Sequence, residues 1–587
     1  MDQMTEPGGA AERLRRQKET AERLEGLSAR LARVLLTRKA PNPAIQGPGY
    51  DLYVKAAAAL WAEAMTDPAK VMTRQTEFLN RSAEAWRQAM TGEAAEPGKD
   101  KRFSDPAWTE NPYFNYVMRQ YQVSADAVTR AVEEIDTLPP AEKRRLGYFT
   151  QQIVDMMAPA NFLGTNPEAL SRAVETEGDS LIRGLENLIG DLEANDGELL
   201  VRLVDESAFE VGGNIATAPG QVVFRNRLIE ILQYEPATET VHETPLLIFP
   251  PWINKFYILD LKEKNSLVRW LTAQGHSVFM VSWVNPDRSY AETGLGDYIE
   301  EGMLAAIAEV RRICGTKTVN AVGYCIAGTV LSITLALLKQ RRQAPVNAAT
   351  LLTALTDFSD QGEFTPFLQD DFLDGIEAVI ERKGMLPAPV MARTFSFLRS
   401  SDLVYGPAVR NYLMGEAPPA FDLLYWNGDS TNLPGRMAQE YLRALFRGND
   451  FARGELQLLG KTLGLAEVSV PVFAVAAETD HIAPWKDCHR GVSQMGSPDK
   501  TFVLAQSGHI AGMVNPPERK KYGYYTNADL GAGQTAWRDQ AQHHPGSWWP
   551  LWAEWLAKRS GKQVPARVPE DKGLGKAPGS YVLEKAK

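Results

Sequence analysis

Seven short apolar runs, separated by longer helical stretches, occupy the chain after about residue 205 and constrain its fold more than any other feature. Several runs are almost entirely apolar, which is typical of strands covered on both faces of a sheet. Strands that alternate with helices predict an α/β fold with a mostly parallel sheet and right-handed crossovers. The runs lie at 222–234, 245–250, 277–283, 319–324, 349–355, 472–477 and 502–505.

The rest of the domain organisation follows from where this strand pattern is missing. The chain has 587 residues, which is too long for one compact core and suits two or three domains. Residues 1–105 are predicted to form a partly flexible N-terminal arm with helices, and residues 106–204 a helical N-terminal domain. Residues 205–587 are predicted to form the α/β domain. Within it the strand pattern lapses between about 359 and 466, which indicates an inserted cap or lid.

The bulk composition excludes several classes of protein. The formal net charge is −10, which argues against a nucleic-acid partner because nucleic-acid binders carry basic patches. No apolar run is long enough for a membrane-spanning helix, and the polar N-terminus lacks the apolar core of a secretory signal. We therefore expect a cytoplasmic protein with no transmembrane segment. The three cysteines form neither a disulfide framework nor a metal motif, so we expect no metal and no cofactor.

The segment VNAVGYCIAGTVLSITLALL (319–338) carries the strongest catalytic signal. An apolar strand, a sharp turn around Cys325 and a helix are the pattern of a nucleophile elbow, which usually reads G-x-S-x-G. The residues two before and two after the nucleophile must be small, and here they are Gly323 and Ala327. The helix N-terminus behind Cys325 favours a thiolate. The alternative is a buried structural cysteine, but the strand–turn–helix context favours the nucleophile.

Two further side chains follow later strands in the order that a catalytic triad requires. Asp480 comes just after the run at 472–477, and His509 just after the run at 502–505. Open α/β sheets gather their sites at the carboxyl ends of their strands, and the expected chain order is nucleophile, acid, histidine. Each residue alone could be structural, but together they predict a Cys325–Asp480–His509 triad. The predicted fold is therefore an α/β-hydrolase fold, with the cap inserted between nucleophile and acid.

Other candidate site residues surround this triad. His481 adjoins Asp480 and is an alternative base and a candidate positioning residue. An oxyanion hole needs two backbone N–H groups, one of them from the residue after the nucleophile, Ile326. The segment FPPWINKFYILDL (249–261) lies where the second donor is expected, and Trp252 or Ile253 would supply it.

The sulfur of Cys325 itself points to a class of reaction. An acyl group on cysteine is a thioester, so transfer from an acyl-CoA to Cys325 would be nearly isoenergetic. The acyl group could then pass downhill to an alcohol and form an oxygen ester, with His509 moving the protons. The pattern thus predicts an acyltransferase that uses thioester substrates.

From about residue 107 to nearly the C-terminus, the chain resembles the class I polyhydroxyalkanoate synthases, bacterial enzymes that polymerise 3-hydroxyacyl-CoA into storage polyester. The resemblance rests on the Cys325 elbow and on long, specific motifs. These are MAPANFLGTNPEA (157–169), DESAFEVGGNIATAPGQVVF (205–224), PPWINKFYILDL (250–261), DLLYWNGDSTNLPG (422–435), ETDHIAPW (478–485), SGHIAGMVNPP (507–517) and HHPGSWWPLWAEWL (543–556). Ala327 departs from the family, which usually has glycine there.

The resemblance implies an activity, partners and a location. The chain would polymerise (R)-3-hydroxyacyl-CoA, with 3-hydroxybutyryl-CoA as the expected short-chain substrate, and would release CoA. The family's catalytic residues fall on Cys325, Asp480 and His509, and Asp480 would also help to activate the 3-hydroxyl group. The active form would be a homodimer on cytoplasmic polyester granules, in contact with the growing polyester chain. The helical N-terminal region would assist dimerisation and granule attachment, and granule-associated proteins are candidate partners.

Several alternatives remain open at this point. A thioesterase or an intracellular polyester depolymerase could use the same three residues, and a granule scaffold could use none of them. The stripe WWPLWAEWL (548–556) is predicted to be a buried aromatic helix, with a polymer-facing surface as the alternative. Arg399 of the cap is a candidate contact for CoA.

Overall fold

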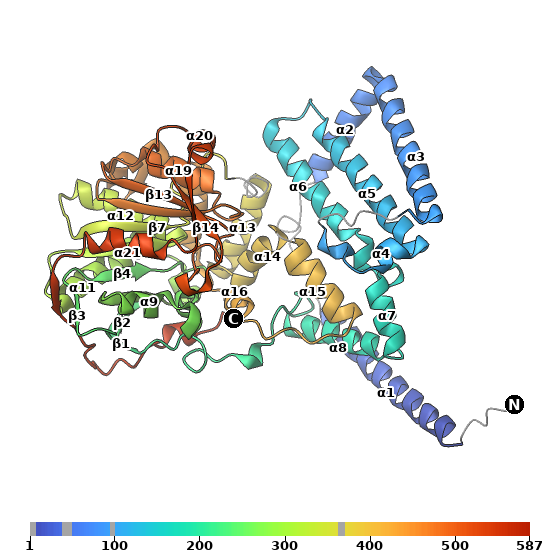
Figure 1. Ribbon diagram of the computed structural model, residues 1–587, viewed down its shortest axis with the longest axis horizontal. Coiled ribbons are helices and arrows are strands. Elements are labelled where there is room, and N and C mark those ends of the chain that lie inside the picture. Colours follow the sequence, from blue (N-terminus) through green and yellow to red (C-terminus); the bar gives the residue numbers. More distant parts are fainter. Residues whose placement is uncertain (1–6, 38–49, 94–99, 362–369, 399, 587) are drawn as a thin grey trace. The chain divides into compact units, whose positions relative to one another are not determined.

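The chain forms two compact units (Figure 1). The computed structural model describes residues 7–37, 50–93, 100–361, 370–398 and 400–586. Unit 1 comprises Met1–Asp205 and Arg399–Pro419, and unit 2 comprises Glu206–Leu398 and Ala420–Lys587. Arg399 and residues 94–99 of the predicted N-terminal arm lie outside the described residues. Among the helices within the described ranges, none is long and apolar enough to cross a membrane.

Unit 1 is helical, which confirms the prediction for the N-terminal region. Two apolar clusters hold it together, one around Trp108 and Met118 and one around Leu52 and Leu146. Its main helices are α1 (Pro7–Thr37), α2 (Tyr50–Thr66), α3 (Pro68–Thr91), α5 (Pro112–Glu133), α6 (Pro140–Met156), α7 (Pro167–Glu175) and α8 (Asp179–Ala194).

A late segment of the chain, 400–419, also belongs to unit 1 because it packs on α8. Gly184 makes this approach possible, since a Cβ there would lie 1.9 Å from the carbonyl oxygen of Tyr412. The Tyr412 hydroxyl donates to Asp191 at 2.7 Å, and the side-chain amide of Asn187 donates to the carbonyl oxygen of Asn411 at 3.0 Å. The strand pattern placed this segment within the cap insertion.

Unit 2 is built on a ten-stranded sheet in the order β1-β2-β5-β4-β6-β7-β12-β13-β14-β15. The six strands from β5 to β13 run parallel, and antiparallel pairs complete the sheet at each edge. The strands are β1 (Gly220–Arg225), β2 (Ile229–Tyr234), β4 (Leu246–Phe249), β5 (Val278–Trp283), β6 (Val319–Tyr324), β7 (Val346–Leu352), β12 (Val472–Ala477), β13 (Lys500–Ala505), β14 (Gly523–Thr526) and β15 (Gln542–Pro545).

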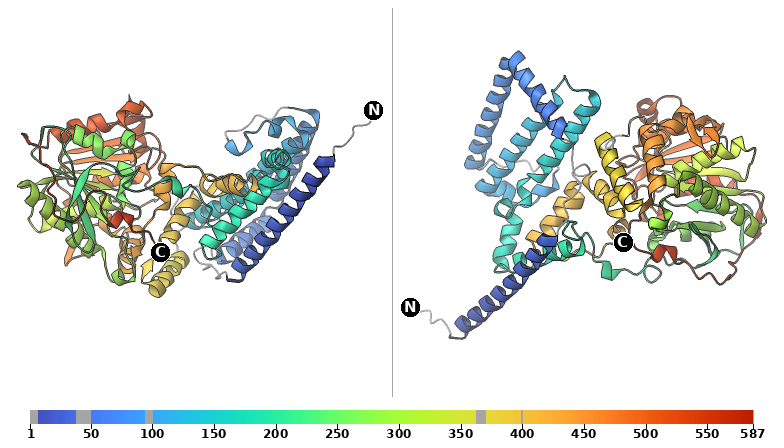
Figure 2. Two further views of the ribbon diagram at one scale, coloured as in Figure 1. Left: turned by 90° about the horizontal axis from the view of Figure 1, so that it is seen from below. Right: turned by 180° about the vertical axis from the view of Figure 1, so that it is seen from behind.

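Helices cover both sides of this sheet (Figures 1 and 2). Every residue of β2, β4, β5, β6 and β12 is buried, as their apolar sequences predict. The covering helices include α9 (Leu267–Ala273), α11 (Ala305–Cys314), α12 (Ile326–Gln340), α19 (Trp485–Gln494) and α21 (Trp549–Ala557). The tryptophans of α21 are buried, with Trp549 and Trp552 at 0% exposure, which confirms the predicted buried aromatic helix.

Within the ten-stranded sheet, the sequence pattern was wrong about one strand and missed two others. The single run predicted at 222–234 is two antiparallel strands, β1 and β2. Asn226 makes the turn, because its side-chain oxygen accepts hydrogen bonds from the N–H groups of Leu228 and Ile229 at 2.9 Å. The missed strands β14 and β15 are short, and their partly exposed aromatic and polar residues lack the apolar signal used to find the others.

Between β7 and β12 the chain leaves the sheet and forms helices and two pairs of short strands. Among its described residues, β8 (Met385–Leu386) pairs with β9 (Leu433–Pro434), and β10 (Leu456–Leu458) pairs with β11 (Lys461–Leu463). The helices of unit 2 in this insertion include α13 (Asp370–Lys383), α14 (Ala388–Leu398), α16 (Asp422–Gly428), α17 (Gly435–Glu440) and the π-helix η13 (Tyr441–Arg447).

Candidate active site

Cys325 occupies a sharp turn between strand β6 and helix α12. Its backbone has φ 55° and ψ −127°, a conformation that residues other than glycine rarely adopt. The Cys325 N–H donates to the carbonyl oxygen of Leu352 on the neighbouring strand β7 at 2.9 Å. Strain of about 1–3 kcal/mol at such a residue persists only where the surroundings enforce it, and it is typical of functional sites.

Small residues around the turn allow the strand and helix to approach. A Cβ at Gly323 would lie 2.5 Å from the Cα of Gly328, and a Cβ at Gly328 would lie 2.8 Å from the carbonyl oxygen of Gly323. Ala327 is fully buried and is accommodated with its methyl group. The tight contact therefore joins Gly323 to Gly328, three residues after the cysteine, and the departure at Ala327 leaves the turn intact.

This contact gives a matched pair of predictions for stability. Gly323→Ala should lower the free energy of unfolding by about 1–3 kcal/mol, because the new methyl group meets backbone atoms that cannot rotate away. Ala327→Gly should cost less than about 1 kcal/mol, because it removes one buried methyl group and creates no overlap. Melting temperatures of the two variants and the parent check this ranking. Equal losses would show that the Gly323–Gly328 contact does not control the turn.

Asp480 and His509 meet beyond the carboxyl ends of the neighbouring parallel strands β12 and β13. The ring Nδ1 of His509 lies 2.6 Å from Oδ2 of Asp480, and the Asp480 side chain is fully buried. The other carboxylate oxygen of Asp480 accepts hydrogen bonds from the N–H groups of Ile482 and Ala483 at 2.8 and 2.9 Å. The acid is therefore held in one orientation by the turn that follows β12.

The charges around His509 favour its protonated form. Burial lowers the pKa of His509, but the Asp480 carboxylate, the Cys325 thiolate and the hydrogen bonds to both outweigh burial and raise it to about 10. Cys325 thus interacts electrostatically with the imidazole of His509. An imidazolium between a carboxylate and a thiolate can return a proton to a leaving group.

The raised pKa of His509 has a consequence for stability at alkaline pH. A histidine whose folded pKa lies above 6.5 stabilises the fold fully below that pH, and this contribution is lost as the pH rises toward about 10. The paired thiolate has lost a proton that an unfolded thiol keeps until about pH 8.5, so the two differences in bound protons cancel below that pH. The melting temperature of the parent should therefore fall more steeply between about pH 8.5 and pH 10 than that of His509→Gln. Thermal unfolding monitored by circular dichroism measures both slopes. Parallel slopes would mean that His509 is not protonated in the folded chain.

Tyr324, which the sequence did not single out, holds the histidine loop. Its hydroxyl donates to the carbonyl oxygen of His509 at 3.1 Å, and its ring stacks on the imidazole with centroids 5.7 Å apart. Tyr324 is fully inside the protein and precedes the cysteine directly. An aromatic residue with a polar tip at the second position of the elbow was the only signal available in the sequence.

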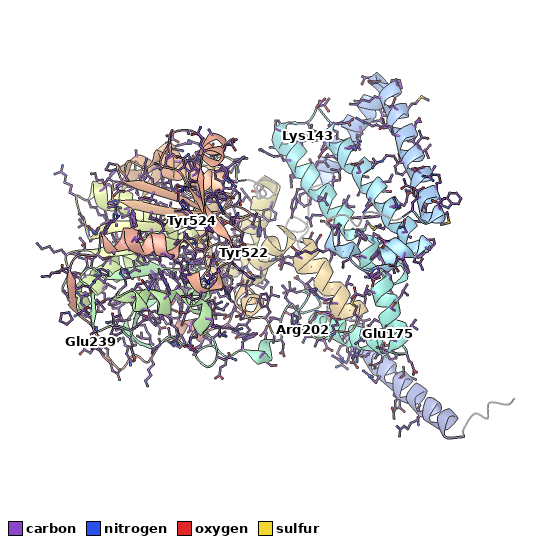
Figure 3. The ribbon with its side chains drawn as sticks, viewed as in Figure 1. Lys143, Glu175, Arg202, Glu239, Tyr522 and Tyr524 are labelled. Atoms are coloured by element: carbon purple, nitrogen blue, oxygen red, sulfur yellow. The ribbon has the colours of Figure 1, made fainter. Side chains whose placement is uncertain are left out.

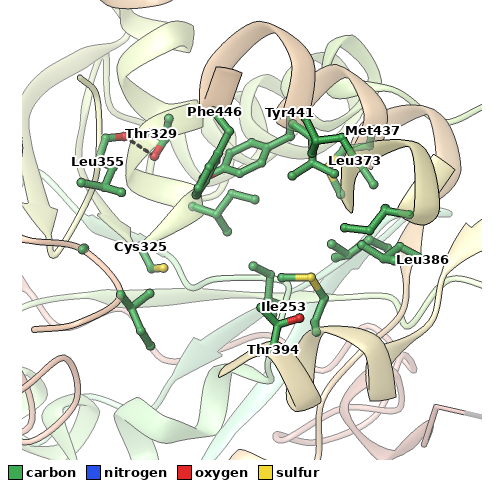
Figure 4. Close-up of a pocket in the computed structure, with 18 of the residues that line it drawn as sticks. Ile253, Cys325, Thr329, Leu355, Leu373, Leu386, Thr394, Met437, Tyr441 and Phe446 are labelled. Carbon is green, nitrogen blue, oxygen red and sulfur yellow. Dashed lines mark hydrogen bonds between the residues drawn. The ribbon is translucent and has the colours of Figure 1, made fainter. Parts of the chain in front are cut away.

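An apolar cavity with a volume of about 100 Å³ opens onto Cys325 (Figure 4). Figure 4 shows the cysteine at one side of the cavity, with Tyr441 and Phe446 on one wall and Ile253 on another. The residues that the insertion contributes include Phe372, Leu373, Ile376, Leu386, Met391, Thr394, Met437, Tyr441, Leu442 and Phe446. The arrangement suits an acyl group or another apolar chain placed against the thiol.

Two residues that the sequence predicts as oxyanion-hole donors belong to the cavity wall. Ile326 and Ile253 both line the cavity with Cys325. Within the described residues, neither donates its N–H to another backbone group. Trp252, the other predicted donor, has a buried side chain that packs against Trp283 and Tyr298 at centroid distances of 5.0 and 4.5 Å.

The remaining cysteines lie in environments that suppress thiolate chemistry. Burial raises the pKa of Cys314 to about 11 and that of Cys488 well above its usual value. Among the described residues, no group of three or more histidine, cysteine or acidic side chains could hold a metal ion.

The remaining histidines pack mainly against aromatic neighbours. His242 and His276 stack on each other, His489 packs on Trp537 and Phe502, and His543 and His544 contact Tyr525 and Tyr524. Tyr524 is labelled in Figure 3. His481 is half-buried in the same turn as Asp480.

Comparison with known proteins supports the reading of both sequence and fold. The model of the "Poly-beta-hydroxybutyrate polymerase (PhaC) N-terminus" matches residues 99–271, and that of the "alpha/beta hydrolase fold" matches residues 245–516. With the ten-stranded sheet, the second match confirms the predicted α/β-hydrolase fold.

Full-length relatives are also similar to this chain. It is 38% identical over 537 residues to the poly(3-hydroxyalkanoate) polymerase subunit PhaC of Rhizobium etli, a match that covers 89% of this chain and 84% of the relative. It is 40% identical over 534 residues to the poly(3-hydroxyalkanoate) polymerase of Methylorubrum extorquens, with coverages of 89% and 88%. Among solved structures, a soluble variant of monoglyceride lipase from Saccharomyces cerevisiae is 12% identical with a TM-score of 0.37, and the match covers 60% of this chain and 99% of that one.

Proposed function

We propose that this chain, which belongs to the family of poly(3-hydroxyalkanoate) polymerases, polymerises (R)-3-hydroxyacyl-CoA into polyester. The reaction proceeds through a thioester on Cys325. The mechanism rests on the strained Cys325 turn and on His509, whose ring interacts electrostatically with Cys325 and lies 2.6 Å from the carboxylate of the buried Asp480. This geometry supports the assignment of Cys325 as nucleophile, His509 as proton carrier and Asp480 as orienting acid.

In the first half-reaction, the Cys325 thiolate attacks the thioester carbonyl carbon of the substrate. The N–H groups of Ile326 and Ile253 stabilise the negative oxygen that develops, a contribution of about 3–4 kcal/mol per donor in related sites. The bond to the CoA sulfur then breaks, and CoA leaves as a thiol with the proton of His509. The acyl group remains on Cys325, and His509 is neutral.

In the second half-reaction, neutral His509 accepts the proton of a 3-hydroxyl group as that oxygen attacks the Cys325 thioester. An oxygen ester forms, and the thiolate and the imidazolium are regenerated. Asp480 holds the ring through Nδ1, so Nε2 is the nitrogen free to exchange the proton. By resemblance, Asp480 also helps to activate the hydroxyl group.

Cysteine suits this sequence of steps because it preserves the energy of the substrate. Acyl transfer from one thiol to another is nearly isoenergetic, whereas transfer from Cys325 to an alcohol is downhill. The apolar cavity beside the thiol supports the placement of an acyl or polyester chain there. A short-chain substrate, 3-hydroxybutyryl-CoA, is part of the proposal and rests on the resemblance alone.

The assembly is also proposed from the resemblance alone. The active form would be a homodimer at the surface of polyester granules, with unit 1 assisting attachment. Exposed apolar side chains on α2 and α3, such as Trp61 and Trp86 at 70% and 57% exposure, support a role for unit 1 in binding a surface.

Incubation with 3-hydroxybutyryl-CoA tests the proposal. The expected products are free CoA and a polyester that can be isolated and identified by its monomer after methanolysis. CoA release accompanied only by free 3-hydroxybutyrate would identify a thioesterase instead, and degradation of added polyester without CoA chemistry would identify a depolymerase. Absence of all three activities would favour a granule scaffold.

A further inference from the structure

The C-terminal segment of the chain reaches the loop that follows β4 and is held there by a buried lysine. The ammonium group of Lys255 donates to the carbonyl oxygens of Val582 at 2.7 Å and Glu584 at 2.8 Å. It also lies 2.9 Å from the carboxylate of Asp429, just after α16, and both side chains are less than one-tenth exposed. A single charged group thus joins three segments that are far apart in the sequence.

The other contacts of this ion pair are also satisfied. The hydroxyl group of Tyr257 donates to the second carboxylate oxygen of Asp429 at 2.8 Å. The indole N–H of Trp426 donates to the carbonyl oxygen of Lys255 at 2.6 Å. A buried charge pair with its remaining hydrogen-bonding groups satisfied fixes geometry strongly, because moving either partner leaves a charge without a partner.

The C-terminal segment is anchored independently a few residues earlier. The buried carboxylate of Glu230 accepts hydrogen bonds from the N–H and hydroxyl groups of Ser580 at 2.9 and 2.7 Å, and from the N–H of Tyr581 at 3.0 Å. Val582 is itself 1% exposed. The carbonyl groups that Lys255 binds are therefore presented by a fixed backbone.

The loop after β4, which ends at Lys255, also contributes Ile253 to the cavity wall. The carbonyl oxygen of Ile253 accepts a hydrogen bond from the N–H of Thr431 at 3.0 Å, and the carbonyl oxygen of Trp252 accepts one from the Thr431 hydroxyl. The loop is thus clamped against residues 429–431, and Asp429 in that segment is held by Lys255. The position of the Ile253 N–H relative to Cys325 depends on these contacts.

We infer that Lys255 is a positioning residue, which couples residues 582–584 of the C-terminal segment to the loop that presents the Ile253 N–H to the reacting carbonyl oxygen. This inference rests on the proposed function, in which that N–H stabilises the oxyanion. The three groups joined at Lys255, namely the two backbone carbonyls and Asp429, are called the C-terminal clasp below. Its loss would leave the cysteine and histidine in place and misplace an oxyanion donor.

The test compares two reactions of Cys325 that differ in their need for an oxyanion donor. Lys255→Met should lower kcat for CoA release by about 10- to 100-fold with KM little changed, because a donor displaced by about 1 Å stabilises the transition state poorly. Alkylation of Cys325 by iodoacetamide develops no carbonyl oxyanion and depends on the thiolate, so its rate should change by less than about two-fold. A merely structural role would slow both reactions together.

A shortened chain provides the second variant. A chain ending at Ser580 loses the carbonyl groups that bind Lys255 and keeps the Ser580 contacts with Glu230. This shortened chain should show the same loss of kcat as Lys255→Met. Adding Lys255→Met to the shortened chain should lower kcat by less than a further factor of about two, because both changes remove the same contact. A chain ending at Lys585 retains both carbonyl groups and should match the parent.

Lys262→Met is the matched side-chain control. Lys262 also pairs with an aspartate of α16, Asp422, at 2.8 Å, but its side chain is 49% exposed and makes a weaker contribution. Melting temperatures establish that each variant is folded, and the shortened chain carries the test if Lys255→Met does not fold.

Three outcomes would overturn the C-terminal clasp: parent-like kcat in Lys255→Met, equal losses in alkylation and turnover, or independent effects of the two changes. Acylation of Cys325 by a p-nitrophenyl ester, followed by nitrophenolate release, tests the clasp without the CoA substrate. If the parent is acylated by this ester but does not release CoA from 3-hydroxybutyryl-CoA, the proposed function is wrong. The rates of the ester reaction in the variants then test the clasp by themselves.

Discussion

Replacing Cys325 by alanine is expected to reduce CoA release from 3-hydroxybutyryl-CoA by at least about 10⁴-fold, or about 5.5 kcal/mol of transition-state stabilisation. Alanine leaves no atom that can hold the acyl group, so the covalent route is closed. The turn should survive, because alanine is no larger than cysteine and the contact of Gly323 with Gly328 is untouched. CoA separated by chromatography measures the loss, and mass spectrometry should find no acyl group on the protein.

Cys314→Ser is the matched control for this prediction. Cys314 lies at the end of α11, away from the cavity residues, and its raised pKa keeps it a thiol. Its replacement should leave CoA release within about two-fold of the parent. If Cys325→Ala released CoA at the parent rate, the covalent mechanism would be wrong, whatever the identity of the product.

Replacing His509 by glutamine is expected to lower the rate of Cys325 acylation by about 10³- to 10⁴-fold. Glutamine retains a hydrogen bond to Asp480 in place of the one at 2.6 Å, but it cannot carry a proton between CoA, Cys325 and the hydroxyl group. Rapid quenching followed by mass spectrometry measures the acylated fraction of Cys325 over time. The affinity for substrate should change little, because the cavity wall is unaltered.

Two companion variants sharpen the assignment of His509. Asp480→Asn should lower turnover by about 10²- to 10⁴-fold and by no more than His509→Gln, because the base remains but its orientation and charge are no longer enforced. His543→Gln is the control, since His543 lies exposed on β15 and contacts Tyr525. Acylation of His509→Gln at the parent rate would exclude His509 as the proton carrier and direct attention to His481.

Much of the fold could be predicted because parallel strands and their helices have strong local patterns. The apolar runs of β4, β5, β6, β12 and β13 are read from consecutive residues, and each is found where the pattern places it. The placement of Asp480 and His509 near one another followed from a property of all such sheets, in which neighbouring parallel strands end at the same edge. No knowledge of distances was needed for that inference.

The predictions failed where the local pattern is weak or shared between two elements. The turn at Asn226 interrupts a run that remains apolar on both sides, so one strand was predicted in place of a hairpin. The residues of 400–419 gave no local sign that they pack on α8, because a glycine such as Gly184 is informative only when its neighbour is known.

The sequence by itself determined the fold class and predicted a candidate nucleophile and the order of the candidate site residues, because these depend on spacings within a few residues and on the order of strands. Only the tertiary structure decided how the site is held. The Tyr324 hydroxyl meets a carbonyl 185 residues away, and Lys255 meets one 327 residues away. Such contacts depend on the packing of the whole domain. A buried charge or hydroxyl group needs a hydrogen-bonding partner, but the local sequence does not indicate which distant residue will supply it.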